Sequence, residues 1–344
     1  MISRVTYGIF IAAIGVLGFT SFSSDKNEVV EFVYPQDWPK PHYNFEDNPL
    51  TQKGFQLGRK LFFDPILSED NTISCGSCHL SFTAFTHADH KLSHGIKGRI
   101  GTRNTSTLIN LAWNTSFMWD GGANNIEVQA INPITNPLEM DLKLAKAVQK
   151  LQSSKEYPSL FYEVFRDSVI TSKTMLKAMA QFTVSLTSFN SKYDSIARGE
   201  LGVKYTPQEK EGYELFKIHC DECHTEPLFT NHSFQNNGLA LDTFLNDVGR
   251  MAMTLDPMDS LKFKVPTLRN ITHSAPYFHD GRVNKLKDVM RHYASEVQQT
   301  KTLAPSLKNG IALTRKEQIS VVAFLKTLTD KSFLYNIHFR EPYK

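Results

Sequence analysis

Two short motifs hold every cysteine of this chain. They read Cys75-Gly-Ser-Cys78-His79 and Cys220-Asp-Glu-Cys223-His224. Each is C-x-x-C-H, the pattern in which two thiols attach one haem c covalently and the histidine binds its iron as proximal ligand. The residue types and their spacing therefore predict two covalently bound haem c groups, one on each motif.

Other uses of paired cysteines fit these motifs less well. A four-cysteine zinc site needs its two pairs close together, and Cys75 and Cys220 lie far apart in the sequence. A thioredoxin-like redox pair stands beside a βαβ pattern, and no such pattern is visible around Cys78 or Cys223. We therefore prefer haem attachment to zinc or thiol redox chemistry.

Each motif is preceded by a similar segment that positions it. Gly58-Arg-Lys-Leu-Phe62 precedes the first motif and Gly212-Tyr-Glu-Leu-Phe216 precedes the second. A glycine four residues before an aromatic residue lies on the same helix face, where the missing side chain lets another helix cross closely. The sequence thus predicts a mainly α fold with two cytochrome c-type haem domains in tandem and long loops.

Three further segments are predicted to be amphipathic helices. Two of them run from Leu142 to Leu151 and from Met175 to Phe189. The third follows Thr314, which forms a capping box with Glu317. After this box, apolar residues recur at roughly helical spacing; they are Ile319, Val322, Phe324, Leu325 and Leu328.

Length and composition agree with this organisation. The chain has 344 residues, which is typical of about two domains. It is 41% hydrophobic and 21% charged, which excludes a disordered or multi-span membrane protein, and its net charge of +3 gives no argument for nucleic-acid binding. We place a peroxidatic haem domain at 45–198 and an electron-transfer cytochrome c domain at 206–335, after an extended, proline-containing arm at 25–44.

Residues 1–24 have the layout of a secretory signal peptide. Arg4 precedes an uncharged apolar run from Tyr7 to Phe19, and small and polar residues follow. The run is short for a membrane span, which needs about 20 apolar residues. An uncleaved anchor is the alternative. Either reading predicts a folded part outside the cytoplasm, in the periplasm.

Around both motifs the sequence resembles the bacterial di-haem cytochrome c peroxidases and the related methylamine-utilisation enzymes. The matching segments are SCGSCHLSFTAFT and GRIGTRNTSTLINLAWNTSFMWDGGANNIEVQAINPITNPLEM in the first half, and FKVPTLRNITHSAPYFHDGR in the second. They cover most of residues 50–330. The resemblance implies that the haem on the first motif reacts with peroxide and that the haem on the second motif receives electrons.

The resemblance also implies catalytic residues. Glu139 stands in the N-P-x-E-M segment, Gln129 in the E-x-Q-A segment, and Trp119 in the W-D-G segment as the tryptophan between the haems. Peroxide cleavage needs a group that takes and returns a proton, and a carboxylate beside the iron can do both. The plain alternatives are a helix N-terminal acid for Glu139 and a core aromatic for Trp119.

A calcium ion between the units is a further implication of the resemblance. Its ligands correspond to the side chain of Asn104 and the carbonyls of Ser274 and Pro276. The family has threonine at the position of Ser274, and a backbone carbonyl makes this exchange harmless.

The chain departs from the family pattern in the loop after the first motif. Many of the peroxidases have a histidine there that caps the resting peroxidatic iron, and the aligned residue here is Ile96. His94 is conceivable as a shifted ligand, and His87 and His90 are near. We favour the alternative that all three are surface loop histidines.

A second departure concerns the distal ligand of the second haem. The peroxidases have a methionine where this chain has Tyr293, as the methylamine-utilisation enzymes do. The competing ligands are Met290, His292, Met251, Met253 and Met258. We expect Tyr293.

These observations predict an exported di-haem peroxidase that reduces hydrogen peroxide to water. The electrons would come from a soluble donor such as a small cytochrome c or a cupredoxin, and a homodimer is a family expectation. One alternative is a methylamine-utilisation-type oxidase of a partner protein, favoured by Tyr293 and the missing loop histidine. The other is a di-haem electron carrier, against which Glu139 argues because a carrier has no use for a distal acid.

Overall fold

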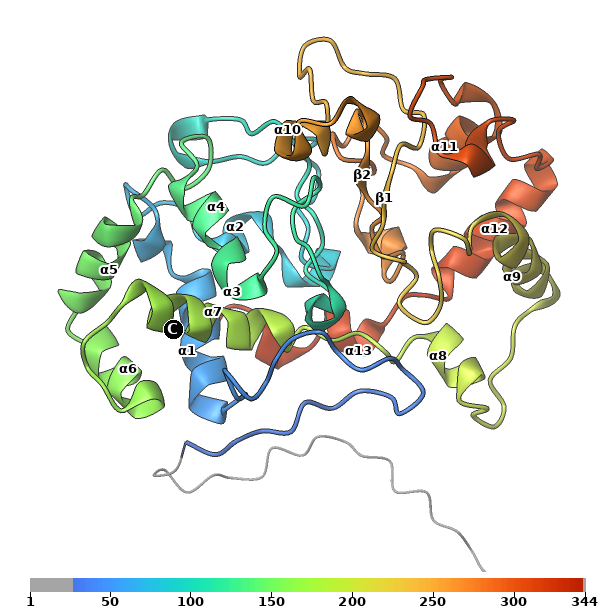
Figure 1. The fold of residues 1–344 in the computed structure, drawn as a ribbon. Coiled ribbons are helices and arrows are strands. Elements are labelled where there is room, and N and C mark those ends of the chain that lie inside the picture. Colours follow the sequence, from blue (N-terminus) through green and yellow to red (C-terminus); the bar gives the residue numbers. More distant parts are fainter. Residues whose placement is uncertain (1–26, 343–344) are drawn as a thin grey trace, which may run out of the picture.

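The computed structural model describes residues 27–342, so the predicted signal peptide at 1–24 lies outside the described residues. Helices dominate, and the short strands β1 (Phe234–Gln235) and β2 (Phe263–Lys264) pair antiparallel. The prediction of a mainly α fold is confirmed (Figure 1). The helices are α1 (Gln52–Phe63), α2 (Cys75–Cys78), α3 (Ile126–Gln129), α4 (Ile131–Thr135), α5 (Leu144–Gln152), α6 (Tyr157–Phe165), α7 (Ser172–Val184), α8 (Lys192–Ala197), α9 (Pro207–His219), α10 (Met251–Thr254), α11 (Leu286–Arg291), α12 (Arg315–Lys326) and α13 (Lys331–Leu334).

The first half is organised by the crossing of α1 and α7. A Cβ placed on Gly58 would lie 2.1 Å from the carbonyl oxygen of Ala178, so only glycine permits this approach. Each helix starts at a threonine cap, since the side chain of Thr51 accepts from Gly54 N and that of Thr171 from Thr174 N. This crossing fixes α1 directly before the first haem motif.

The second half repeats the arrangement with α9 and α12. A Cβ on Gly212 would lie 1.8 Å from the carbonyl oxygen of Ser320. The predicted capping box of Thr314 and Glu317 starts α12, and both of its reciprocal hydrogen bonds are present. The predicted role of the two lead-in glycines is thereby confirmed.

Two predicted helices differ in their bounds. The helix predicted to end at Phe189 is α7, which ends at Val184 because the next residues bond to Asn110 instead. The backbone N of Asn110 donates to Leu186 O at 2.9 Å, and Ser188 N donates to Asn110 Oδ1 at 2.8 Å. The helix predicted from Leu142 starts at Leu144. The backbone N of Leu142 donates to Ile134 O at 2.8 Å, which holds it in the preceding turn.

Buried aromatic rings form the core that surrounds each motif. In the first half, Phe62 and Phe182 lie 5.1 Å apart by ring centroids. In the second, Phe216 lies 5.0 Å from Phe324 and 5.6 Å from Phe229. These rings give each motif an apolar setting.

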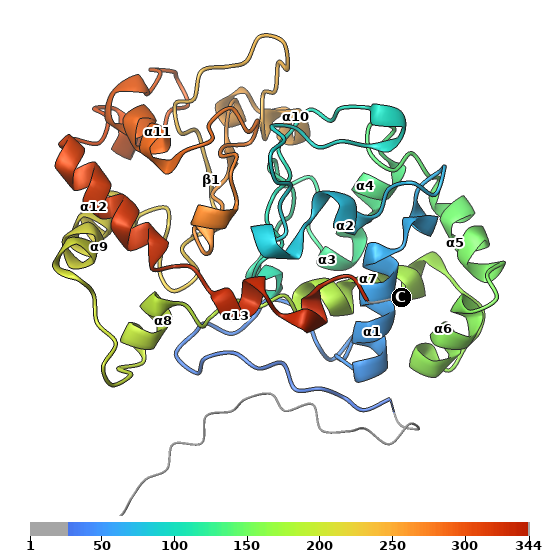
Figure 2. The same cartoon turned by 180° about the vertical axis from the view of Figure 1, so that it is seen from behind.

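The two halves are joined by contacts that cross between them. Asp194 on α8 forms a buried two-point ion pair with Arg269, at 2.8 and 2.9 Å. The C-terminal segment carries α13 back to the first half, where Phe333 lies 5.9 Å from Phe85 (Figure 2). Within residues 27–342, no helix combines the length and apolar character needed to cross a membrane.

Candidate haem sites and the residues between them

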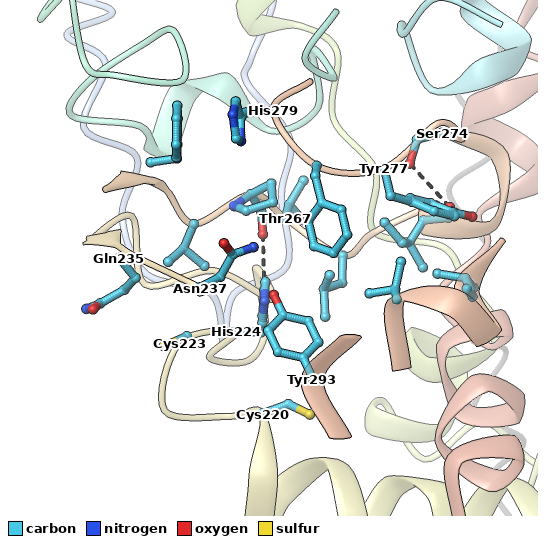
Figure 3. Close-up of a pocket in the computed structure, with 18 of the residues that line it drawn as sticks. Cys220, Cys223, His224, Gln235, Asn237, Thr267, Ser274, Tyr277, His279 and Tyr293 are labelled. Atoms are coloured by element: carbon cyan, nitrogen blue, oxygen red, sulfur yellow. Dashed lines mark hydrogen bonds between the residues drawn. The ribbon is translucent and has the colours of Figure 1, made fainter. Parts of the chain in front are cut away.

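The second motif opens into a large cavity. Cys220, Cys223 and His224 line it together with Tyr293 (Figure 3), and its volume is about 1550 Å³ including the open mouth. Most of its lining is apolar, which suits a bulky planar cofactor.

His224 is presented in the form that binds iron. Its Nδ1 lies 3.2 Å from Phe229 O and 3.1 Å from Pro266 O. Carbonyl oxygens only accept, so Nδ1 carries the proton and Nε2 keeps its lone pair. Burial lowers the pKa of His224 to about 4, which keeps the imidazole neutral.

The first motif has the same proximal arrangement. The Nδ1 of His79 donates to Phe85 O at 2.6 Å, and burial lowers the pKa of His79 to about 4. The residues Cys75–Cys78 form α2, so both thiols and the following imidazole are presented by one helical turn. Both motifs therefore fit a haem with a histidine whose tautomer is fixed by the backbone.

The thiols themselves argue against the redox-pair alternative. All four cysteines are free, and burial raises the pKa of Cys75 and of Cys220 to about 12. Reactive C-x-x-C pairs have a lowered thiol pKa. Partly buried, neutral thiols fit attachment sites for an apolar cofactor better than a thiolate catalyst.

Glu139 lies near the first motif. Its charge raises the pKa of both Cys75 and Cys78. Burial raises the pKa of Glu139 itself, although its Oε1 accepts a hydrogen bond of 2.9 Å from Asn136 Nδ2. Glu139 lies in a turn between α4 and α5, and the first turn of α5 contains no acidic residue. The alternative that Glu139 is an acid at the N-terminus of a helix is therefore wrong.

Trp119 lies between two cavities. It lines the cavity of the second motif and also a neighbouring cavity of about 740 Å³, which Gln129 and Met118 line as well. Its Nε1 donates to Asn104 O at 2.9 Å, and its own carbonyl accepts from Lys264 N at 2.7 Å. Backbone bonds from both halves thus hold this indole in place.

Tyr293 lines the cavity opposite the second motif, close enough that Cys220 and Cys223 add to the burial that raises its pKa to about 12. Met290 is the one competitor named above that shares this lining. His292 is turned away, with its Nε2 3.0 Å from Asn237 O. The other three, Met251, Met253 and Met258, do not line the cavity, and the last two are exposed.

A π-helical turn, His292–Glu296, follows α11 and contains Tyr293. Such turns insert an extra residue into a helix and occur frequently at functional sites. The sequence did not predict this turn, because a helix that contains a π-helical turn has nearly the same pattern of apolar residues as a regular α-helix.

The three residues assigned to calcium, Asn104, Ser274 and Pro276, all line the large cavity of the second motif. The backbone of Asn104 donates to His279 O at 2.7 Å, and its Nδ2 donates to Lys91 O at 3.0 Å. Asn104 therefore lies at the junction of the two halves.

Two buried bases beside Trp119 were missed from the sequence. Lys264 lines both cavities, its Nζ donates to Ser116 O at 3.0 Å, and burial lowers its pKa to about 8. His232 lines the smaller cavity, and its buried Nε2 has no hydrogen-bond partner among the described residues. Only the tertiary contacts identify them, although Lys264 stands in the FKVPTLRN segment.

Comparisons with known proteins agree with this geometry. A sequence profile for di-haem cytochrome c peroxidases matches residues 52–202. The methylamine utilization protein MauG of Methylophilus methylotrophus is 32% identical over 321 residues, which cover 90% of this chain and 91% of that protein. The cytochrome c551 peroxidase of Nitrosomonas europaea is 35% identical over 278 residues, covering 80% and 79%.

Solved structures show the same fold. A crystal structure of a MauG-like protein associated with microbial copper homeostasis has a TM-score of 0.82 at 30% identity and covers 92% of this chain and 100% of its own. The di-haem peroxidase BthA of Burkholderia thailandensis has a TM-score of 0.71 at 21% identity, with coverages of 85% and 90%, and supports the fold alone. The chain thus belongs to the di-haem cytochrome c peroxidase family, oxidoreductases that use peroxide as electron acceptor.

Proposed function

We propose that this protein is a periplasmic di-haem peroxidase that reduces hydrogen peroxide to water with electrons from a small soluble cytochrome c or cupredoxin. The observation that carries this proposal is the position of Glu139, a shielded carboxyl beside the first haem motif. An electron carrier has no need of such an acid. An exported chain is expected from the signal-like N-terminus, and a homodimer is proposed from the family alone.

Both motifs fit haem c, because each joins two partly buried thiols to a neutral histidine whose Nδ1 is held by a backbone carbonyl. When bound, the first haem supplies the redox-active iron at which the O–O bond of peroxide is cleaved. The chain supplies the proton transfers. A carboxylate oxygen of Glu139 takes the proton from one peroxide oxygen and returns it to the departing oxygen, so that water leaves.

The raised pKa of Glu139 suits this double task. A general acid–base works best when its pKa lies near the working pH, because neither protonation state is then too scarce. Burial moves the pKa of Glu139 in that direction from its ordinary value of about 4.5. Asn136 holds the carboxyl in place through its hydrogen bond to Oε1.

Trp119 is proposed to connect the two haem sites. Its indole lines both cavities, and its Nε1 is held by Asn104 O. An aromatic ring fixed beside the second motif is proposed to pass electrons that enter there toward the first haem. Gln129 lines the smaller cavity together with Trp119 and is proposed to orient peroxide at the first haem.

Tyr293 is proposed as the distal ligand of the second haem, and Asn104, Ser274 and Pro276 as calcium ligands. The amide and carbonyl oxygens of the last three are of the type that calcium prefers, and all three residues line one cavity. Calcium bound here would connect two parts of the chain. One is the loop with Asn104, whose carbonyl accepts the hydrogen bond from Trp119, and the other is the second half, which contains Ser274 and Pro276.

The test uses the purified full chain with both haems bound. Ferric protein is mixed with hydrogen peroxide and a reduced small cytochrome c, and oxidation of the cytochrome is followed by absorbance. We expect sustained turnover that is lost in Glu139→Gln. Peroxide consumption no faster than that of free haem would disprove the proposal.

A second candidate is an oxidase that acts on a partner protein. Two observations favour it: Tyr293 lines the cavity of the second motif, and Ile96 is fully buried where the resemblance leads one to expect a capping histidine. Peroxide alone then separates the candidates. An oxidised state that persists for minutes and that reduced cytochrome c does not reset would favour the partner-protein oxidase.

A further inference from the structure

Three histidines pack together on the loop after the first haem motif. The ring centroids of His87 and His90 lie 4.5 Å apart, those of His90 and His94 4.4 Å, and those of His87 and His94 5.9 Å. None of the roles proposed above uses these rings. We propose that His87, His90 and His94 bind one divalent transition-metal ion through three imidazoles, with Cu²⁺ held more tightly than Zn²⁺.

The loop is built to hold the three rings near one another. The segment that carries the three rings lies between two isolated antiparallel bridges, Leu80 with Thr86 before it and His94 with Ile100 at its end. Between them Asp89 adopts a left-handed conformation, with φ at +64°. Within this short segment the three rings lie next to one another.

Apolar packing does not explain the grouping. His90 is exposed and His87 and His94 are only partly buried, so the rings do not belong to a core. Three imidazoles that came together as cations would repel one another. The neutral imidazole is the form that binds metal.

The spacing matches a shared ion. Zinc–nitrogen bonds are about 2.0–2.1 Å, which places the centres of two imidazoles on one tetrahedral ion about 5 Å apart. The three measured separations lie on either side of this value, and the His87 and His90 rings are stacked at 23°, so one of the two must turn before both can bind one ion. In addition, the Nδ1 of His87 is buried and has no hydrogen-bond partner within the described range, so its lone pair is free for a ligand or an ion.

The nitrogens are not yet directed at one point. No three His, Cys, Asp or Glu side chains in residues 27–342 are preassembled for a metal ion. Binding therefore requires that these exposed or partly buried rings rotate about their side-chain torsions into other rotamers. Imidazole suits copper, nickel and zinc, and affinity rises to a maximum at copper along the first-row series.

The site touches the first haem motif, although the proposal does not depend on the peroxidase activity. The carbonyl of His94 accepts a weak hydrogen bond of 3.4 Å from Cys78 Sγ. An ion held by all three rings would keep the His94 imidazole in the loop. The same ring cannot then serve as a ligand of the first haem.

The test is a metal titration of the full chain with both haems bound, after dialysis against a chelator. Cu²⁺ or Zn²⁺ is added in competition with a chromophoric chelator, and EPR of the copper-loaded protein reports nitrogen ligands. We expect one tight equivalent, with Cu²⁺ preferred. Because loss of even an outer-shell partner costs about 10–100-fold in metal affinity, each of His87→Ala, His90→Ala and His94→Ala should weaken binding at least about 10-fold.

His42→Ala is the matched control, since it removes an exposed histidine elsewhere. It should leave the tight equivalent unchanged, and unaltered haem content shows that every variant is folded. Three outcomes would overturn the proposal: no tight equivalent in the wild type, equal losses in His42→Ala and His90→Ala, or a His94→Ala variant that keeps the metal while its resting haem spectrum changes.

Discussion

The backbone N of Ile96 donates a hydrogen bond of 2.8 Å to the carbonyl oxygen of Glu139. The two segments also pack tightly, because a Cβ on Gly95 would lie 2.1 Å from Leu138 O. Ile96 occupies the loop position at which the resemblance leads one to expect a capping histidine. Its backbone is therefore bonded directly to Glu139, the proposed catalytic acid, and its side chain is fully buried.

This relationship predicts an open first haem in the resting protein. Ile96 has no lone pair for iron, and its backbone bond to Glu139 holds the loop in place. The fully ferric protein should show a high-spin haem and react with stoichiometric peroxide within seconds, without pre-reduction. Optical and EPR spectra before and after peroxide measure this directly.

His94→Ala is the control for that experiment. If His94 were a sixth ligand, the resting spectrum would change in this variant, whereas an open site predicts no change. Two low-spin ferric haems in the wild type, reactive only after half-reduction, would refute the open-site interpretation.

Glu139→Gln tests the proton transfers. The amide cannot take up the peroxide proton, and general acid–base catalysis contributes about 10²–10⁴-fold. The turnover number should fall by about this factor while both haems stay bound with little-changed resting spectra. A variant with full activity would remove Glu139 from the mechanism.

The same substitution should change how stability depends on pH. Burial raises the pKa of Glu139 in the folded protein above its ordinary value of about 4.5. Because the folded protein favours the protonated carboxyl, this group contributes its full stabilising free energy below a pH of about 4.5. That contribution is lost as the pH rises through the pKa of Glu139 in the folded protein. The melting temperature of Glu139→Gln relative to wild type should thus rise from pH 4 to pH 7.

Glu214→Gln, which changes an exposed glutamate on α9, is the comparison for this pH series. Its melting temperature should follow the wild type across the range. If the melting temperature of Glu139→Gln relative to wild type stays constant or falls with rising pH, burial does not hold the Glu139 carboxyl in its protonated form.

The double substitution Cys75→Ala/Cys78→Ala tests covalent attachment at the first motif. Without both thiols neither thioether can form there, and the denatured chain should retain one covalent haem instead of two. Haem staining on a denaturing gel and pyridine haemochrome analysis give the count. Cys220→Ala/Cys223→Ala should remove the other haem, and zinc bound in place of any haem would contradict the assignment.

Gly212→Ala tests the close crossing of α9 and α12. An added Cβ would lie 1.8 Å from Ser320 O, so the helices must separate. Overpacking of this kind typically costs about 1–3 kcal/mol, whereas alanine in an unhindered helix would stabilise by about 1 kcal/mol. Thermal unfolding followed by circular dichroism should show a lower midpoint.

Lys210→Ala provides the contrast, since Lys210 lies exposed on the same helix. It should leave the midpoint almost unchanged. Equal midpoints for Gly212→Ala and wild type would mean that α12 can move away from α9 without loss.

The features read correctly from the sequence are local ones. Two cysteines and a histidine form each haem motif within five residues, and Thr314 and Glu317 cap α12 across a single turn. The lead-in glycines Gly58 and Gly212 are also visible, because a missing side chain at a helical position signals a close neighbour. In the haem motifs and the helix cap the physical cause acts over a few residues, so spacing alone is sufficient. For Gly58 and Gly212 the sequence shows the missing side chain, but the helix that packs against it is distant along the chain.

Tertiary contacts decided the rest. Asn110 ends α7 through residues distant in the sequence, and Trp119 gains its place between two cavities from Asn104 and Lys264. The bond between Ile96 and Glu139 and the packing of the three loop histidines likewise depend on how loops meet in space. A hydrogen bond or ring contact between distant segments involves only the two residues that meet. Their neighbours along the chain are not constrained by it, so such a contact produces no repeating pattern in the sequence.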